Sequence, residues 1–357
     1  MNRKVLIALG VTTLVSPFVL RFFRRMSRRG LSQSTSSGKV SPFLPSFSEL
    51  KQTVLEKINS EYNKPDSVIV FMGIERATDI SEPHSSEGEN TVRVMLLQNL
   101  EKKITAQTHK ANPFLPPFQT GIFITDLGST HRLIFNKFMV TREHALVITQ
   151  DFEAQTQSLT EADLGYSYLV ASSIDGFVFF NSDRRAGASM PHKHLQVVPY
   201  KRFKMPYLQK LLEVIERSQV LSEKNQLNEL NCVYLTFPFF EAYKHVLLKF
   251  RPMNETTDTL ESYSAYLKTV YEDARERLGC AKINHSFNLI FGTNWMLLVL
   301  RKNERTLAET SVNALGSLGS ILTSRLDRYE LLTAKKPSEI YSQIFVEKED
   351  SNVYLVE

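Results

Sequence analysis

Apolar and polar positions recur with two different periods along this chain, and the period predicts each element. Apolar residues three and four positions apart predict helices over 48–62, which stops before Pro65, and over about 256–278. A third helix is predicted to open at Ser158, where Ser-Leu-Thr-Glu has the pattern of a capping box. The polar stretch 81–90 is interpreted as a loop.

Short apolar runs rich in β-branched and aromatic residues predict strands. The first half of the chain has two such runs joined by a short connection that suits antiparallel pairing, then a helix, then two more runs. The same order recurs more weakly after residue 230. The predicted strands are 68–72, 92–97, 133–138, 145–149, 176–181, 192–198, 233–237, 245–250, 286–291 and 296–301. We therefore predict an α+β fold built from two copies of one unit, each an antiparallel sheet with flanking helices.

The stretch from His192 to Gln196 has the residue types of a reactive site. Side chains alternate across a strand, so His192, His194 and Gln196 should share one face, and Lys193, Leu195 and Val197 the other. Asn181 begins a loop that runs through Gly187, Ala188, Ser189 and Met190, where small residues let backbone N–H groups approach an anion. The combination predicts a phosphate-binding loop that leads into a strand of imidazoles.

A neutral imidazole is a good nucleophile toward phosphorus near neutral pH. His194 is the central residue of the motif and is the predicted nucleophile. Asn181 and the 187–190 backbone would hold the phosphate oxygens, Gln196 would donate to one of them, and Lys137 would add positive charge. Structural or metal-binding histidines are the alternative, but a zinc site needs further ligands, and the cysteines at 232 and 280 are far away in sequence.

Charge is distributed unevenly over the 357 residues. The formal net charge is +5, but residues 1–48 contain eight basic and no acidic residues, so the remaining chain carries 5 − 8 = −3. A mildly acidic body excludes a general nucleic-acid surface, so phosphate chemistry must depend on a local site. The two cysteines do not make a disulfide framework.

The first 47 residues are predicted to be a leader and linker rather than part of the fold. An apolar run from Val5 to Leu20 is followed by arginines and a serine-rich tract. This composition predicts a mitochondrial or plastid transit peptide. The alternatives are a membrane anchor, with contact through residues 5–23, and a protein that stays in the cytoplasm.

The His192 to Gln196 motif, the Asn181 to Met190 loop and the run 133–138 together resemble the ATP adenylyltransferases, also called diadenosine tetraphosphate phosphorylases. These belong to the histidine-triad superfamily, in the branch of galactose-1-phosphate uridylyltransferase. The similarity covers about residues 48–345 and includes the Asn112-Pro113-Phe114 turn. It implies two histidine-triad-like units, a catalytic one over 48–202 and a degenerate one over 203–357, in which 311–319 lies near the place of the histidine strand.

The resemblance implies phosphorolysis of diadenosine tetraphosphate to ATP and ADP through an adenylylated histidine, usually with a divalent cation such as Mg²⁺. Some members of the family also convert adenylyl sulfate and phosphate to ADP and sulfate. The phosphate-binding set then becomes a substrate-binding set. Its members are Lys102 with Lys103 as its rival, Asn136, Lys137, Asn181, Gly187, Ala188, Ser189, Met190, Gln196, Gly292, Thr293, Asn294 and Arg301.

The same resemblance assigns His194 as the nucleophile and His192 as the residue that orients it. Gln196 stands where hydrolases of the superfamily have a third histidine, which fits transfer to phosphate better than hydrolysis. No Cys-x-x-Cys occurs, so no zinc site of the uridylyltransferase kind is expected. A nucleotide-sugar phosphorylase and a catalytically silent, membrane-tethered nucleotide-binding protein remain the alternatives, and the oligomeric state is open.

Overall fold

The computed structural model describes seven segments of the chain, namely 46–64, 67–84, 88–98, 112–202, 205–222, 230–280 and 285–349. Residues 1–45 of the predicted leader and linker lie outside these segments, and so do Lys102 and Lys103. The last two residues of that prediction belong to the fold, because Ser46 caps helix α2 and the Phe47 ring is buried in the core. None of the helices within the segments is long and apolar enough to cross a membrane.

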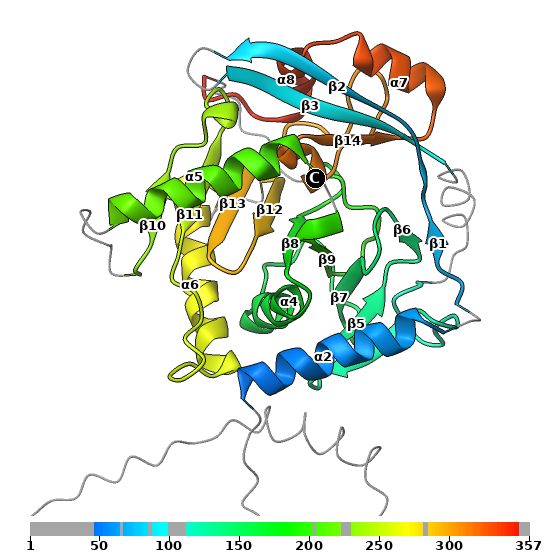
Figure 1. The fold of residues 1–357 in the computed structure, drawn as a ribbon, viewed down its shortest axis with the longest axis vertical. Coiled ribbons are helices and arrows are strands. Elements are labelled where there is room, and N and C mark those ends of the chain that lie inside the picture. The colour runs from blue at the N-terminus through cyan, green and yellow to red at the C-terminus, as the bar shows by residue number, and fades with distance from the viewer. Residues whose placement is uncertain are drawn as a thin grey trace, which may run out of the picture.

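A nine-stranded sheet forms the centre of the molecule, in the order β10-β11-β13-β12-β8-β9-β7-β5-β4 (Figure 1). All of its neighbouring strands pair antiparallel. The strands are β4 (Phe123–Leu127), β5 (His131–Phe135), β7 (Ala145–Thr149), β8 (Gly176–Asn181), β9 (His194–Pro199), β10 (Val233–Leu235), β11 (His245–Lys249), β12 (Phe287–Phe291) and β13 (Trp295–Leu300). Each of these strands except β4 overlaps a strand that the sequence predicts.

Two units with the same connectivity meet in this sheet. The first runs β7, α4 (Glu161–Ser173), β8, β9, and the second runs β11, α6 (Leu260–Leu278), β12, β13. In both units the last strand lies between the other two. The units join where β8 pairs with β12, with Asn181 opposite Asn288. The predicted order of strands and helix is therefore confirmed in both halves, and the halves share one sheet.

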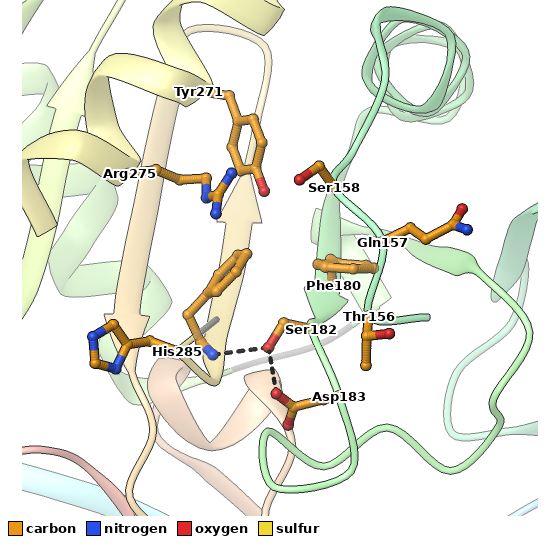
Figure 2. A pocket seen from close by; sticks show the side chains of 10 residues that line it. Thr156, Gln157, Ser158, Phe180, Ser182, Asp183, Tyr271, Arg275 and His285 are labelled. Atoms are coloured by element: carbon orange, nitrogen blue, oxygen red, sulfur yellow. Dashed lines mark hydrogen bonds between the residues drawn. The ribbon is translucent and has the colours of Figure 1, made fainter. Parts of the chain in front are cut away.

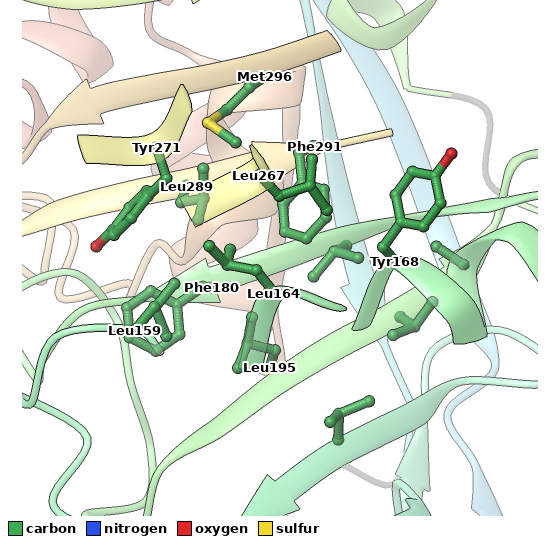
Figure 3. Packing of buried hydrophobic residues seen from close by; sticks show 14 of the residues in the cluster. Leu159, Leu164, Tyr168, Phe180, Leu195, Leu267, Tyr271, Leu289, Phe291 and Met296 are labelled. Atoms are coloured by element: carbon green, nitrogen blue, oxygen red, sulfur yellow. The ribbon is translucent and has the colours of Figure 1, made fainter. Parts of the chain in front are cut away.

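Helices α2 (Phe47–Tyr62), α4 and α6 cover one face of the sheet. Leu164 of α4 and Leu267 of α6 pack against sheet residues such as Leu195 and Leu289 (Figure 3). Helix α4 begins later than predicted, because Thr160, not Ser158, is its N-cap and forms a capping box with Asp163. Leu159 is buried in the core, so the chain enters the helix only after this residue.

The other face is covered by α5 (Pro206–Ser222), α7 (Leu326–Thr333), α8 (Pro337–Ile344) and a three-stranded sheet of β2 (Ile74–His84), β3 (Gly88–Leu97) and β14 (Ser320–Thr323) (Figure 1). Strand β8 is buried on both faces, with Val178 and Phe180 toward the helices and Phe177 and Phe179 toward this cover. This alternation is the period of a central strand.

The predicted loop over 81–90 is wrong, because most of it belongs to the hairpin of β2 and β3. Cross-strand polar pairs stabilise this hairpin, such as Arg93 with Asp79 at 2.7 Å and Ser81 with Thr91 at 2.9 Å. A polar sequence can therefore form a strand when its partner strand supplies matching groups. The remaining short elements are the parallel pair β1 (Val70–Phe71) and β6 (Phe138–Met139), and the 3₁₀ turns η1 (Tyr200–Arg202), η2 (Pro238–Phe240) and η3 (Ala314–Leu318).

Candidate active site

His194 is the first residue of β9, and its ring is fixed by the backbone. Its Nδ1 lies 2.8 Å from the carbonyl oxygen of His192. A carbonyl only accepts hydrogen bonds, so Nδ1 carries the proton and Nε2 carries the lone pair. His194 is only 4% exposed. The arrangement therefore fixes Nδ1 as the donor and leaves Nε2 as the ring nitrogen that can act as a nucleophile.

His192 lies just before β9, in an isolated bridge with Ala154, so the strand begins two residues later than predicted. Its Nε2 donates to the Thr149 carbonyl oxygen at 3.0 Å, and its Nδ1 lies 2.9 Å from the Asn112 side-chain nitrogen. Nδ1 therefore accepts from Asn112, and the ring is neutral. Burial lowers the pKa of His192, which favours the same neutral form.

The Asn112-Pro113-Phe114 turn forms one wall beside the two histidines. The Phe114 ring centroid lies 5.7 Å from that of His192 and 5.2 Å from that of His194. Phe152, which is 56% exposed, contacts the His192 ring at 5.4 Å. His192 is therefore held by aromatic rings as well as by hydrogen bonds, while its carbonyl orients His194.

Gln196 lies on the same sheet face as His194, as predicted, while Leu195 and Val197 point into the helix-side core. The Gln196 Oε1 atom lies 3.0 Å from Nε2 of His144. His144 is a site residue that the sequence reasoning missed. The signal was available, because His144 immediately precedes the strand that pairs with β9, with Leu146 opposite Gln196.

Asn136 and Lys137, both predicted to bind substrate, follow β5 directly. The Asn136 side-chain nitrogen lies 3.3 Å from Nε2 of His144, and its Oδ1 accepts from the Phe138 N–H at 3.1 Å. Asn136 therefore lies beside the His144–Gln196 pair. The Lys137 ammonium donates to Gln119 Oε1 at 2.8 Å.

The loop from Ser182 to Met190 is a compact turn. The Asp183 carboxylate accepts from the Ala186 N–H at 2.8 Å, and the Asp183 carbonyl accepts from the Ala188 N–H at 2.9 Å. Gly187 has φ +96°, and a Cβ there would lie 2.7 Å from the Val312 oxygen. Only glycine fits this position without strain. Ser189 is exposed, while Met190 packs on the apolar cluster that contains Phe114.

Asn181 and Arg301, both predicted to bind substrate, lie in a buried network below this loop. The Asn181 Oδ1 atom accepts from Asn288 at 2.9 Å and from the Ala314 N–H at 2.8 Å. Arg301 donates to Asn288 Oδ1 at 2.7 Å and to the Val312 carbonyl at 2.7 Å. Arg301 is 0% exposed. Burial lowers its pKa to about 9. The network joins the loop to the second unit.

Gly292, Thr293 and Asn294 form the tight turn between β12 and β13. Because β12 is antiparallel to β8, this turn lies beyond the Phe291–Val178 pair, at the other end of the strands from Asn181. The structure therefore does not bring it to His194. In the second unit, this turn takes the place of the long 182–193 loop of the first unit. The strand that corresponds to the histidine strand is therefore β13, and the expectation that 311–319 lies near that place is wrong.

Lys193 is buried and points to the helix face of the sheet, as the predicted alternation of side chains requires. Its partners there are charged side chains. Its ammonium lies 2.5 Å from Glu153 and 3.3 Å from Asp163, and Asp163 also contacts His131 at 2.9 Å. Burial alone would raise the pKa of Asp163. The His131 hydrogen bond and the charges of His131 and Lys193 outweigh burial and lower it.

A small pocket lies on the helix side, where α6 meets the ends of β8 and β12 (Figure 2). Its volume of ≈ 30 Å³ is enough for water but not for a nucleotide. Ser182 at its edge accepts from the Phe287 N–H at 2.9 Å and donates to Asp183 at 3.2 Å (Figure 2). These bonds fix the start of the 182–190 loop. Neither His192 nor His194 lines this pocket.

Within the described segments, no group of three or more His, Cys, Asp or Glu residues could hold a metal ion. The residues around His194 are imidazoles, amides and backbone N–H groups. Among the residues that the structure describes, a divalent cation finds no cluster of carboxylates there, and oxygen ligands are what Mg²⁺ prefers.

Fold and site together define an α+β protein of two similar units, with a buried pair of histidines as the candidate active site in the first. The family model for the Ap4A phosphorylase N-terminal domain matches residues 82–213, and the model for the ATP adenylyltransferase C-terminal domain matches 238–347. The chain therefore belongs to the ATP adenylyltransferase family, which confirms the resemblance seen in the sequence.

Two yeast proteins illustrate the relationship. Protein APA1 of Saccharomyces cerevisiae is 25% identical over 273 residues, which is 70% of this chain and 79% of APA1. The crystal structure of yeast Ap4A phosphorylase Apa2 in complex with AMP has a TM-score of 0.60 at 22% identity, and the match covers 85% of this chain and 98% of Apa2. The Apa2 crystal structure with Ap4A has a TM-score of 0.58 at 21% identity, over 84% of this chain and 98% of that one.

Proposed function

We propose that this protein is a nucleotidyltransferase that phosphorolyses diadenosine tetraphosphate to ATP and ADP through an adenylylated His194. Family membership supports the reaction class, and the names of the relatives support the substrate. One observation carries the assignment of the nucleophile. The His192 carbonyl holds the proton of His194 on Nδ1, so the lone pair is on Nε2.

In the first step, Nε2 of His194 attacks the α-phosphorus of one adenylyl end. The P–N bond forms as the bond to the bridging oxygen breaks, and that oxygen leaves as part of ATP. The imidazole becomes positively charged. The Nδ1–H bond to the His192 carbonyl then becomes charge-assisted and stronger, which stabilises the charged form.

In the second step, an oxygen of inorganic phosphate attacks the same phosphorus. The P–N bond breaks, ADP forms, and neutral His194 is regenerated. Two displacements through one covalent intermediate replace a single difficult one. Because Gln196 cannot take a proton from water, it fits an acceptor that is already an anion.

Negative charge that builds on the transferred phosphoryl group needs donors that are already in place. His144 holds Oε1 of Gln196, so the amide nitrogen is the end available to a phosphoryl oxygen. Within the loop, the N–H groups of Gly187 and Ala188 already donate to the Arg184 and Asp183 carbonyls, so the N–H groups proposed for the phosphoryl oxygens are those of Ser189 and Met190. The buried Arg301 network keeps the loop in position. Lys102, Asn136 and Lys137 complete the proposed substrate contacts of the first unit.

A divalent cation such as Mg²⁺ would be held by the phosphate oxygens of the substrate and would offset their negative charge. The polyphosphate chain supplies the oxygen ligands that the described part of the site lacks. Turnover should then follow the concentration of the magnesium–dinucleotide complex. Adenylyl sulfate is proposed as a second substrate, because it presents the same α-phosphorus with sulfate as the leaving group.

The test is to incubate the protein with adenine-labelled diadenosine tetraphosphate in the absence of phosphate. We expect an acid-labile adenylyl-protein. His194→Ala should abolish this label and lower turnover by roughly 1,000-fold or more. His192→Ala should retain part of the label, because it removes the packing and hydrogen bonds around the nucleophile but not Nε2 itself.

His285→Ala is the matched control, because this histidine lines the separate small pocket. It should keep the full label. Full label in His194→Ala would refute the role of His194. Nucleotide sugars run in parallel test the alternative substrate class, and equal turnover without adenine preference would contradict the proposed substrate.

A further inference from the structure

Strands β8 and β9 part just before they reach the site. Their ladder runs from Gly176–Pro199 to Phe179–Gln196 and ends there, although β8 continues to Asn181 and β9 begins at His194. Beyond this point β8 stays paired only with β12 on its other side. The β8–β9 ladder therefore ends before it reaches His194, the proposed nucleophile.

The side chain of Gln155 fills this gap and is 3% exposed. Its Oε1 accepts from the His194 N–H at 2.9 Å. Its Nε2 donates to the Asn181 carbonyl at 2.7 Å and to the His194 carbonyl at 3.3 Å. One amide group thus satisfies both backbone groups of His194 and joins them to β8.

Gln155 is itself held against the same segment. Its N–H donates to the Pro191 carbonyl at 2.7 Å, and the Lys193 N–H donates to the Glu153 carbonyl at 2.7 Å. These bonds flank the bridge between Ala154 and His192. Residues 153–155 therefore form a short strand-like brace along 191–193, and the Gln155 side chain extends it to His194.

We propose that Gln155 is a positioning residue for the nucleophile, an inference that rests on the proposed role of His194. The His192 carbonyl orients the ring of His194. The direction in which Nε2 points therefore depends on the backbone of residues 192–194. Gln155 binds this backbone directly. A displacement of about 1 Å at a nucleophile can cost on the order of 100-fold in rate.

The first experiment replaces Gln155 with methionine, which has similar volume but cannot form these hydrogen bonds. We expect the rate of adenylyl transfer at saturating dinucleotide to fall roughly 10- to 100-fold, with KM within about twofold. Gln155→Asn keeps the amide on a shorter side chain, so its rate of adenylyl transfer should lie between those of the native protein and Gln155→Met. Gln157→Met is the control, because Gln157 is exposed and its side chain lines the small pocket.

The second experiment separates positioning from a general structural role. In His194→Gly, added imidazole supplies a nucleophile that is not attached to the backbone. Gln155→Met should then cause no further loss of imidazole-supported turnover. An equal 10- to 100-fold loss in both backgrounds, or a raised KM with unchanged maximal rate, overturns the proposal.

Failure of the proposed function has a different signature. If imidazole restores nothing and His194→Gly keeps its adenylyl label, His194 is not the nucleophile and the proposal falls with it. If imidazole restores no turnover and the label is absent, the test rests on Gln155→Met in the protein that keeps His194. A lower maximal rate with unchanged KM then supports the proposal, and a raised KM with unchanged maximal rate overturns it. Should the methionine variant fail to fold, as judged by its thermal midpoint, the asparagine variant carries the same comparison.

Discussion

At the scale of single residues, the buried polar groups have the clearest roles. Arg301 has no exposed surface and donates to the carbonyls of Ala186, Asn303 and Val312 as well as to Asn288. A guanidinium in this position holds together segments that lie far apart in sequence. We therefore assign its main effect to the shape of the 182–190 loop.

Arg301→Met should lower the free energy of unfolding by about 3 to 5 kcal/mol, because several carbonyls lose their donor. Arg301→Lys should not restore the lost free energy of unfolding, since one ammonium cannot reach acceptors on several sides. Urea unfolding measures both. If Arg301→Met unfolds like the native protein and only KM rises, Arg301 contacts substrate instead.

His192 should make stability depend on pH. Burial lowers its pKa below the ordinary 6.5, so the folded state resists protonation while the unfolded state accepts it. The stability that His192 contributes is complete above about pH 6.5 and is lost as the pH falls through the folded pKa. The free energy of unfolding of the native protein should therefore exceed that of His192→Ala by more at pH 7.5 than at pH 5.5. This difference should change by up to about 1 kcal/mol between the two pH values. Parallel urea titrations check this, and a constant difference would contradict it.

At the scale of elements, the histidine strand is held on its helix side by charge. Lys193 connects β9 to the first turn of α4, where Asp163 also caps the helix through Thr160. Asp163 and Lys193 each have side chains that are 1% exposed. Such pairs are costly to break because the remaining charge stays buried.

Lys193→Met should cost about 3 kcal/mol in free energy of unfolding, because Asp163 loses one of its buried partners while His131 remains. The loss should shrink as the pH falls, since Asp163 can then be protonated. Lys201→Met is the control, because Lys201 and its partner Asp175 are exposed. Denaturant titrations at two pH values measure the effect, and a loss no larger than that of the control would show that the buried pair adds nothing.

At the scale of the whole molecule, the two units are halves of one sheet. They pair between β8 and β12, and α4 and α6 contribute to the same helix-side core (Figure 3). The reactive residues belong to the first unit, while Asn288, Arg301 and Ala314 of the second hold its loop. The second unit therefore holds in place the loop beside the candidate site of the first.

Residues 48–202 and 203–357 expressed separately should not fold, since each would expose the unpaired edge of β8 or β12 and half of a core. The intact chain should unfold in one calorimetric transition. Circular dichroism and calorimetry test this. A cooperative transition in the separate 48–202 fragment would contradict it.

The local patterns were enough to predict the strands of both units, their order around one helix each, and the shared face of His194 and Gln196. Period and neighbouring residues decide these features, because a strand alternates its side chains wherever it lies. The resemblance to a known family rested on the same short motifs. Lys102 and the leader lie outside the described residues, so their roles stay predictions.

Only the tertiary structure decided which residues surround the nucleophile. His144, Gln155 and the Lys193–Asp163 pair reach the histidine strand from segments 30 to 52 positions away. It also buried Arg301 below the loop and put Gly292 at the opposite end of the strands from Asn181. Strand pairing and packing between distant segments set these contacts, and no local period in the sequence carries that information.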